Sequence, residues 1–216
     1  MGEDSKSAGF LEPRPERISK FSAKSRKEPP ETGVPLLTII AGPNGSGKST
    51  LTKSVDFDGL ERLLDPDAVA RALNPMNPAA AAIAAGREVL KTIDSYLGSG
   101  VSFAVETTLS GKGNLDLIDT AKARGYEIHL VFVGVDTPER SISRVRSRAA
   151  RGGHFIPDAD VRRRYERAMA NSPRAFRSAG IATFYDNSED QARLILIAKD
   201  GMVVWRTVPL PAWVRL

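Results

Sequence analysis

A glycine-rich segment that directly follows a short apolar run is the feature that most constrains how this chain of 216 residues folds. Residues 36–41 are apolar and rich in β-branched side chains, which predicts a strand buried on both faces. The next eight residues have the spacing G-x-x-x-x-G-K-S, and with the following threonine the loop comprises Gly42, Pro43, Asn44, Gly45, Ser46, Gly47, Lys48, Ser49 and Thr50. In such a loop the backbone N–H groups wrap a phosphate. Lys48 would reach the β- and γ-phosphates of a nucleotide, and Ser49 would ligate Mg²⁺.

Strand-like and helical segments alternate after this loop. Four further segments have the pattern of strands, at 62–65, 101–106, 126–135 and 181–185. Helical patterns or spacing are found at 48–55, 79–98, 113–124, 138–150 and 158–169. Two short runs, 194–198 and 202–207, predict a small C-terminal hairpin. The alternation predicts an α/β fold with a mostly parallel five-stranded sheet, helices on both faces and a ligand at the carboxyl ends of the strands.

The chain divides by composition into a tail and one domain. Residues 1–34 are rich in proline and mixed charge without an apolar period, which predicts a disordered or loosely docked tail. An interaction arm is the alternative for this segment. Residues 35–216 are expected to form one domain. No apolar run reaches the roughly 18–20 residues of a membrane span, so we expect a cytoplasmic protein without membrane contact.

Composition excludes several classes of site. The chain has no cysteine, which rules out disulfides, zinc–thiolate sites and cysteine nucleophiles. It has two histidines, too few for a three-histidine metal centre. Its net charge of +5 is concentrated between Arg140 and Arg167, where nine arginines accompany three acidic residues. An arginine block of this kind suits a compact polyanion such as a triphosphate at least as well as a long nucleic acid.

Polar residues after the second and third predicted strands are candidates for binding an acceptor. Asp67 follows the second strand, where a carboxylate can orient an acceptor hydroxyl and take its proton. Its alternative role is a helix N-cap, which Asp65 could fill instead. Glu106 ends the third strand and could hold the acceptor or a water on Mg²⁺. Thr107 and Thr108 are expected to shape the turn or orient the substrate.

The arginine block predicts a lid over the phosphates. Arg144, Arg148 and Arg151 are spaced by four and three residues, so they fall near one face of a helix. Guanidinium groups there could neutralise the charge that develops on a transferred phosphoryl group. The alternative is a solvated basic face. Of the three consecutive arginines 162–164, at most one or two can point inward. Asn187, after the fifth predicted strand, is expected to meet the base of the nucleotide, with an Asx turn as an equal alternative.

The nucleotide loop alone does not identify a reaction. A small GTPase would carry a guanine-reading N-K-x-D segment, and none is found. An oligomeric ATPase motor would be longer and would end a strand with Asp-Glu. The remaining class is a kinase that phosphorylates a small acceptor and carries its own arginine-rich lid.

These motifs, taken in order, resemble the zeta toxin-like P-loop kinases. The matching pieces are residues 42–50, Asp65-Pro66-Asp67, residues 103–111, residues 151–157, residues 161–165 and Asp186-Asn187-Ser188. The resemblance implies a three-layer P-loop kinase fold and ATP-dependent phosphorylation. The acceptor that it implies is the 3′-hydroxyl of UDP-N-acetylglucosamine or a related nucleotide sugar. It also implies a toxin role with an antitoxin protein as partner.

The resemblance carries roles to individual residues. The base aspartate falls on Asp67, the loop lysine on Lys48 and the substrate-side glutamate on Glu106. The lid arginines fall on Arg144 and on either Arg148 or Arg151. One departure is the stretch Thr-Thr-Leu-Ser after Glu106, where some toxins have Gly-Thr, so the acceptor pocket is expected to differ.

Two other functions stay open from the sequence. The first is a polynucleotide or nucleoside kinase, which the arginine block favours, although a nucleic-acid partner is the less favoured reading. The second is a non-enzymatic nucleotide-binding module whose site is occupied by a partner protein.

Overall fold

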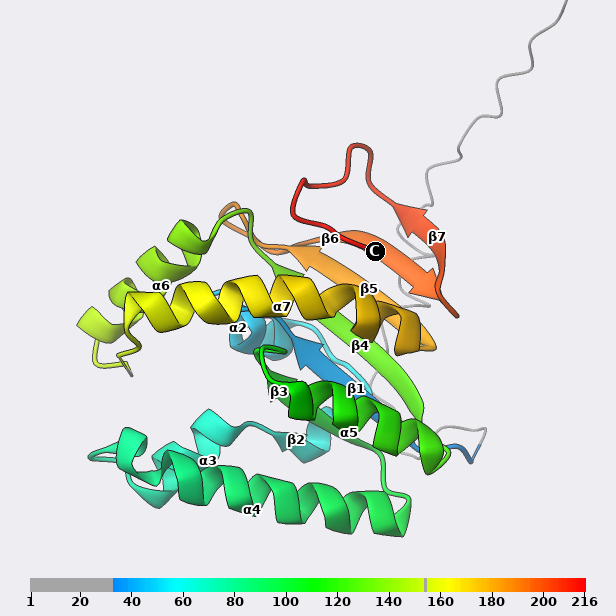
Figure 1. Ribbon diagram of the computed structural model, residues 1–216, viewed down its shortest axis with the longest axis horizontal. Helices are drawn as coiled ribbons and strands as arrows, with labels where there is room; N and C mark the ends of the chain where they lie inside the picture. The colour runs from blue at the N-terminus through cyan, green and yellow to red at the C-terminus, as the bar shows by residue number, and fades with distance from the viewer. Residues whose placement is uncertain (1–32, 154) are drawn as a thin grey trace, which may run out of the picture.

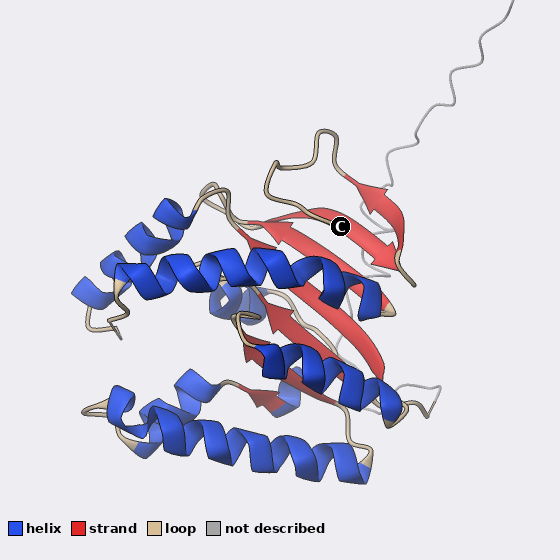
Figure 2. Ribbon diagram, viewed as in Figure 1, coloured by secondary structure: helices blue, strands red, loops and turns tan. Residues whose placement is uncertain are grey.

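A computed structural model describes residues 33–153 and 155–216, so the predicted tail lies almost wholly outside the described residues. The described chain forms one sheet in the order β2-β3-β1-β4-β5-β6-β7. Figure 1 shows this twisted sheet with helices packed against it, and Figure 2 separates the two kinds of element by colour. The strand bounds are β1 Leu36–Ala41, β2 Leu63–Leu64, β3 Phe103–Thr107, β4 Glu127–Gly134, β5 Ile181–Asp186, β6 Arg193–Lys199 and β7 Met202–Arg206.

The first five strands are parallel to one another, which confirms the predicted α/β fold class. In the middle of the sheet, Ile39 pairs with Val105 of β3 on one side and with Leu130 of β4 on the other. The predicted hairpin is present as β6 and β7, and it extends the sheet because β6 pairs antiparallel with β5. The complete sheet therefore has seven strands. The carboxyl ends of β1 and β3, which precede the candidate residues, lie side by side.

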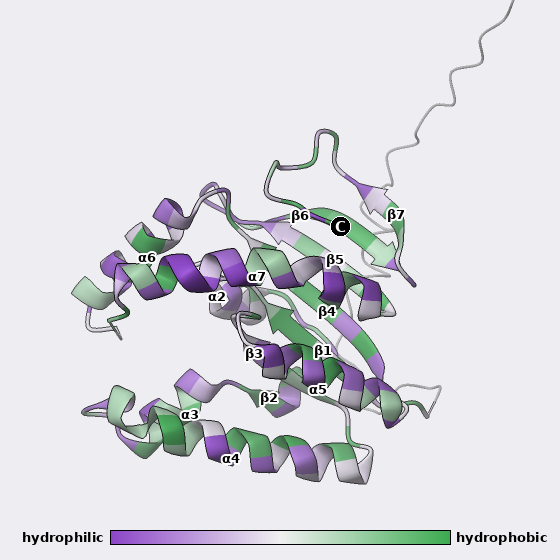
Figure 3. Ribbon diagram, in the orientation of Figure 1, coloured by the Kyte–Doolittle hydropathy of each residue, from purple (hydrophilic) through white to green (hydrophobic). Residues whose placement is uncertain are grey.

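Helices cover both faces of the sheet, as predicted. Helices α4 (Pro78–Ser99), α5 (Lys112–Ala123) and α7 (Asp158–Ser178) share one apolar cluster with the front of the sheet in Figure 1. Helix α2 (Lys48–Ser54) and Phe57 pack in a second cluster against the other face. Figure 3 shows β1 as strongly hydrophobic, as expected for a strand buried between two layers. No helix in the described ranges is long and apolar enough to cross a bilayer.

The remaining helices surround the carboxyl ends of the strands. A 3₁₀ turn η1 (Leu60–Arg62) leads into β2, and α3 (Pro66–Leu73) follows it. Helix α6 (Pro138–Ala150) packs against the start of α7. The strongly polar first half of α7 is visible in Figure 3. These elements place α3 and α6 where the chain leaves β2 and β4.

Helix α7 is nine residues longer than the predicted 158–169 segment and continues through Pro173. Proline has no backbone N–H, so the carbonyl of Met169 loses its usual donor four residues later. The buried hydroxyl of Ser172 donates to that carbonyl at 3.0 Å and replaces the missing bond. The added turns bring buried Ala175 and Phe176 onto the sheet. Local compensation together with packing therefore carries the helix past the proline.

Because a histidine is buried in the sheet, we expect the free energy of unfolding to decrease at acidic pH. His129 is buried in β4, its ring lies edge-on to Phe57, and burial lowers its pKa to about 4. As the pH falls below the ordinary value of 6.5, the unfolded chain binds a proton that the folded chain does not. The stability due to neutral His129 is therefore complete above pH 6.5 and lost toward pH 4. We expect about 2–3 kcal/mol of this contribution to be lost by pH 4.5.

Urea unfolding of the wild type and of His129→Gln at pH 7 and pH 4.5 measures this contribution. The variant cannot titrate at this position, so its free energy of unfolding should fall less than that of the wild type. Equal falls in both proteins would show that His129 is protonated in the folded state at an ordinary pKa.

Candidate functional site

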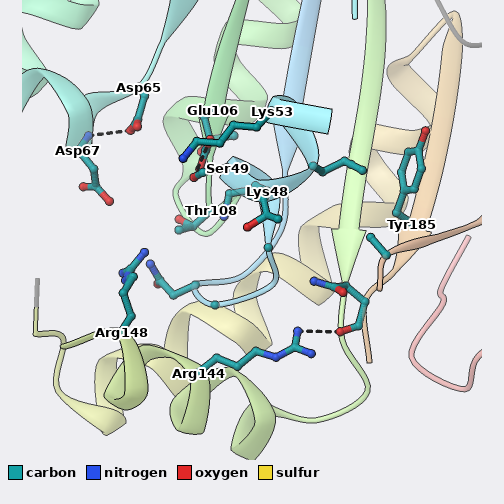
Figure 4. A pocket seen from close by; sticks show the side chains of 18 of the residues that line it. Lys48, Ser49, Lys53, Asp65, Asp67, Glu106, Thr108, Arg144, Arg148 and Tyr185 are labelled. Carbon is teal, nitrogen blue, oxygen red and sulfur yellow. Dashed lines mark hydrogen bonds between the residues drawn. The ribbon is translucent and has the colours of Figure 1, made fainter. Parts of the chain in front are cut away.

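A deep cleft of about 1220 Å³ opens at the carboxyl ends of β1 and β3. The nucleotide loop, α2, the start of α3, the loop after β3, α6 and the loop after β5 form its walls. Figure 4 shows the cleft from close by, with acidic groups on one side and arginines on the other. The cleft lies at the place predicted from the alternation of strands and helices.

The loop between β1 and α2 folds into the wall of this cleft. Gly47 has φ of 95°, a left-handed conformation that side-chain-bearing residues rarely adopt. A Cβ atom on Gly47 would also lie 2.2 Å from Nδ2 of Asn187. Glycine is therefore required both by the turn and by the close approach of the loop after β5. Six of the nine predicted loop residues line the cleft, namely Asn44, Gly45, Gly47, Lys48, Ser49 and Thr50.

The three remaining loop residues, Gly42, Pro43 and Ser46, are buried, and their carbonyl groups accept hydrogen bonds that hold the site together. Lys48 is buried, and its ammonium group donates to the carbonyls of Gly42 at 2.9 Å and Pro43 at 3.2 Å. The carbonyl of Ser46 accepts a hydrogen bond from another loop, described below. Burial lowers the pKa of Lys48, while the nearby carboxylate of Glu106 opposes this effect. The lysine is thus a buried cation held at the inner end of the cleft.

Ser49 and Glu106 meet although they are 57 residues apart in the sequence. The hydroxyl of Ser49 donates to the carboxylate of Glu106, with distances of 2.8 Å to Oε1 and 3.1 Å to Oε2. Burial raises the pKa of Glu106, and Lys48 and the hydrogen bond from Ser49 act against that rise. Figure 4 shows the two side chains together beside Lys48. The sequence placed each of them at this edge of the sheet, and the structure joins them.

Asp65 and Asp67 have different positions at the start of α3. Asp65 is the N-cap, and its Oδ1 accepts from the backbone N–H of Asp67 at 2.9 Å. Asp67 lies in the first turn and lines the cleft, so it is free of the capping role that was its alternative. Figure 4 shows its carboxylate facing the interior of the cleft. Burial lowers the pKa of Lys48, and Asp67, like Glu106, is close enough to that lysine to oppose the effect.

The loop after β3 presents hydroxyl groups to the same cleft. Thr107 and Thr108 both line it. The hydroxyl of Thr107 accepts from the N–H of Leu109 at 3.1 Å, and Thr108 shares a 2.8 Å hydrogen bond with Ser110. Leu109 is fully buried with φ of 56°, and Asn171 of α7 holds its carbonyl at 2.8 Å. Thr107 therefore shapes the turn, as expected, and Thr108 and Ser110 form a polar wall.

Eight of the nine arginines in the block fall into two groups. Four of its members form ion pairs with acidic side chains, namely Arg140, Arg146, Arg162 and Arg163. Four others line the cleft, namely Arg144, Arg148, Arg151 and Arg164. The sequence suggested a block with few acidic partners, and this was wrong for the first group because Asp136, Glu139, Asp158 and Asp160 approach in space. At most one or two of residues 162–164 were expected to point inward, and of the three Arg164 lines the cleft.

The three arginines that were predicted to form a lid all line the cleft, and they differ in how they are held. Arg144 donates to the backbone carbonyls of Asn187 at 2.7 Å and Glu189 at 3.0 Å. Arg151 donates through Nε to the carbonyl of Ser147 at 3.1 Å. Figure 4 shows Arg148 rising from α6 toward the space between Asp67 and the nucleotide loop. Arg148 and Arg151, the two predicted choices for the second lid arginine, therefore both line the cleft.

Two cations of the cleft were missed from the sequence, Lys53 of α2 and Arg71 of α3. Arg71 of α3 lines the cleft and lies 3.5 Å from the carboxylate of Asp65. It follows Asp67 by four residues, so helical spacing places both side chains on one face of α3. The four-residue spacing of Asp67 and Arg71 could have identified this arginine from the sequence. It was overlooked because residues 66–73 were not among the predicted helices. The α3 side of the cleft thus carries an arginine in addition to those of α6 and α7.

Comparison with known proteins agrees with this geometry. The sequence profile of the Zeta toxin family matches residues 21–199. An uncharacterized protein of Haemophilus influenzae is 38% identical over 127 residues, which are 59% of this chain and 90% of that protein. The solved structures cited next are less than 25% identical, so they are informative about fold alone.

Two of these structures cover most of the chain. A chain of the AvrRxo1-ORF1:AvrRxo1-ORF2 complex has a TM-score of 0.61 at 19% identity, covering 79% of this chain and 60% of that one. A structure from the PezAT toxin–antitoxin system of Streptococcus pneumoniae has a TM-score of 0.55 at 16% identity, covering 92% and 82%. This chain therefore spans less than two thirds of the AvrRxo1 chain. The profile match confirms the resemblance seen in the motifs: the chain belongs to the Zeta toxin family of P-loop kinases.

Proposed function

We propose that the protein transfers the γ-phosphoryl group of ATP to a hydroxyl group of a small acceptor. The observation that carries this proposal is the shared cleft, in which the nucleotide loop, the carboxylate of Asp67 and the lid arginines face one another. A phosphoryl-transfer site needs these three parts, because it must hold the donor, position the attacking hydroxyl and neutralise the developing charge. A structure of the AvrRxo1 complex that contains ATP supports the choice of nucleotide.

The residues of the cleft fit a triphosphate with Mg²⁺. Oδ1 of Asn44 is buried without a hydrogen-bond partner in the described part of the chain, so the loop has unused polar capacity beside the cleft. The hydroxyl of Ser49 and the carboxylate of Glu106 supply oxygen atoms of the kind that Mg²⁺ prefers. Ser49 would ligate the ion directly, and Glu106 would hold one of its waters. Mg²⁺ would supply positive charge to the β- and γ-phosphate oxygens.

The chain's own residues account for the remaining steps. Asp67 would accept the proton of the acceptor hydroxyl as the new O–P bond forms and the bond to the leaving ADP breaks. Lys48 would neutralise charge on the β- and γ-phosphates. Arg144 and Arg148 would stabilise the negative charge on the equatorial oxygens, with Arg151 assisting from the end of α6. Hydrogen bonds hold Lys48 and Arg144 before reaction, so these two groups need little reorganisation when charge develops.

The acceptor that we propose is UDP-N-acetylglucosamine, phosphorylated at its 3′-hydroxyl, or a related nucleotide sugar. Membership in the Zeta toxin family supports this choice. A diphosphate-bearing acceptor also agrees with the presence of Arg71 and Arg164 in the cleft, since both are cations in addition to the proposed lid set. Glu106, Thr107 and Thr108 would hold the polar groups of the sugar.

The acceptor is tested by incubating purified protein with ATP, Mg²⁺ and a panel of hydroxyl compounds, with products identified by mass. The panel contains UDP-N-acetylglucosamine, nucleosides and oligonucleotides with free 5′ ends. A phosphorylated nucleotide sugar is expected. Phosphorylation of nucleosides or oligonucleotide ends alone would replace this acceptor and retain the kinase chemistry.

We further propose a protein partner of antitoxin type that covers the cleft. Support comes from the PezAT toxin–antitoxin system and the two-component AvrRxo1 complex, to which the fold is similar. Co-purification from the native host, followed by an ATP-binding assay of the complex, tests this partner. A bound protein that lowers ATP affinity is expected, and a protein recovered alone at full activity would contradict the proposal.

If the hydroxyl of Ser49 ligates Mg²⁺, its removal should increase the Mg²⁺ concentration that phosphoryl transfer requires. Ser49→Ala removes the proposed Mg²⁺ ligand, so the Mg²⁺ concentration for half-maximal transfer should rise about 10-fold. Ser49→Thr retains the hydroxyl and serves as the matched control. Titration of Mg²⁺ at fixed ATP measures the shift. An unchanged Mg²⁺ requirement in Ser49→Ala would remove this residue from the metal site.

A further inference from the structure

We infer that Asn187 is a positioning residue that ties the nucleotide loop to the lid, rather than a contact for the base of the nucleotide. The inference rests on the proposed function and concerns how its site is assembled. The side chain of Asn187 donates through Nδ2 to the carbonyl of Ser46 at 2.8 Å. These two residues are 141 positions apart, so the bond joins the loop after β1 to the loop after β5.

The backbone of Asn187 holds the lid at the same time. Its carbonyl accepts from Arg144 at 2.7 Å, and the carbonyl of Glu189 accepts from the same guanidinium at 3.0 Å. The N–H of Asn187 donates to the carbonyl of Gly134 at the end of β4, at 2.9 Å. One residue is therefore bonded to the nucleotide loop, to the end of a central strand and to a lid arginine.

The nucleotide loop is shaped to receive this side chain. Nδ2 of Asn187 would be 2.2 Å from a Cβ atom on Gly47, so the absence of a side chain at Gly47 makes the contact with Ser46 sterically feasible. Because Nδ2 is directed at the loop carbonyl, it holds the loop that must present its N–H groups to the phosphates. A base-reading role would instead direct this nitrogen at the nucleotide.

The loop that carries Asn187 is anchored independently of any ligand. The preceding Asp186 is 4% exposed and accepts from Trp213 Nε1 at 3.0 Å and from the hydroxyl of Ser188 at 2.5 Å. The N–H of Asp136 in turn donates to the hydroxyl of Ser188 at 2.9 Å. A rigidly held loop is suited to positioning, because its rotamers and backbone are fixed by packing and hydrogen bonds.

Ligands with and without a base distinguish a positioning role of Asn187 from a role in contacting the base. Inorganic tripolyphosphate has phosphates and no base, so its binding reports on the loop alone. For Asn187→Ala we expect the affinities for tripolyphosphate, ATP and GTP to fall together, by about 10-fold, since the buried carbonyl of Ser46 loses its donor. The preference for ATP over GTP should stay unchanged. Calorimetry or competition with a fluorescent nucleotide measures all three affinities.

Two further variants complete the test. Asn187→Asp fills the same space and replaces the donor by an acceptor, so it should show the same loss even if Asn187→Ala folds poorly. Glu189→Gln changes only an exposed side chain and retains the carbonyl that holds Arg144, so its affinities should equal those of the wild type. Retained tripolyphosphate binding in both Asn187 variants, with or without a changed preference for ATP over GTP, would overturn the inference.

Turnover distinguishes this inference from the proposed function. Asn187→Ala should lower kcat by a similar factor in the wild-type and in the Arg144→Ala background, because the substitution removes the donor to Ser46 but retains the backbone carbonyl that holds Arg144. An effect that disappears in the Arg144→Ala background would show that the side chain acts through Arg144 and would contradict a role through the nucleotide loop. A wild type that binds tripolyphosphate but phosphorylates no acceptor would refute the proposed function, and the affinity measurements would still decide the role of Asn187.

Discussion

Replacing Lys48 by alanine is expected to lower kcat for phosphoryl transfer by about 10³-fold. The ammonium group is buried at the inner end of the nucleotide loop, held by the carbonyls of Gly42 and Pro43. A charge preorganised in this way stabilises the transferred phosphoryl group far more than a flexible surface lysine would. Steady-state release of ADP in the presence of acceptor measures the loss.

The matched control for this variant is Lys91→Ala, which removes an exposed lysine of α4 with 78% of its side chain accessible. It changes the net charge of the protein equally and should leave kcat unchanged. Thermal unfolding of Lys48→Ala must show a single transition near that of the wild type. A folded Lys48→Ala with kcat within about 10-fold of the wild type would contradict the placement of the γ-phosphate beside this residue.

Asp67→Asn is expected to lower kcat by about 10²–10⁴-fold while the affinity for ATP changes little. The amide retains the size of the carboxylate and cannot take the proton of the acceptor hydroxyl. Asp67 lies across the cleft from the nucleotide loop, so nucleotide binding does not require its charge. Single-turnover transfer and ATP binding, measured on the same preparation, separate the two quantities.

Asp65→Asn provides the neighbouring comparison, because asparagine also caps helices well. The N–H of Asp67 would keep its acceptor, and α3 would keep its start. We expect transfer by this variant to fall less than 10-fold, on the order of a lost exposed ion pair with Arg71. Equal losses in Asp65→Asn and Asp67→Asn would assign the effect to the local charge of α3 instead of to proton transfer.

The parts of the site that the sequence predicted are those encoded by contiguous residues. The nucleotide loop was predicted because its glycine spacing, the preceding strand and the following helix all lie within residues 36–54. Glu106 and Asp67 were placed at the same edge of the sheet because parallel strands align their carboxyl ends. Apart from α3 and the second half of α7, the strand and helix segments were recognised from β-branched runs and helical spacing, and the structure shifts their ends by a few residues.

The parts that the sequence missed depend on contacts between distant segments. The ion pairs of Arg162 with Glu139 and of Arg146 with Asp158 form only when α6 and α7 pack together, so they are not visible as helical spacing. The extension of α7 past Pro173 depends on Ser172 and on packing against the sheet. The hydrogen bond between Asn187 and Ser46 of the nucleotide loop joins residues that are 141 positions apart in the sequence.

The most direct test of phosphoryl transfer is the balance between ADP and phosphoester when wild-type protein is incubated with Mg²⁺, ATP and UDP-N-acetylglucosamine. We expect one phosphate monoester on the acceptor for each ADP released, with Lys48→Ala producing neither. Release of ADP with an equal amount of free phosphate and no phosphorylated acceptor, across the full acceptor panel, would show an ATPase and contradict the assignment of Asp67 to an acceptor hydroxyl.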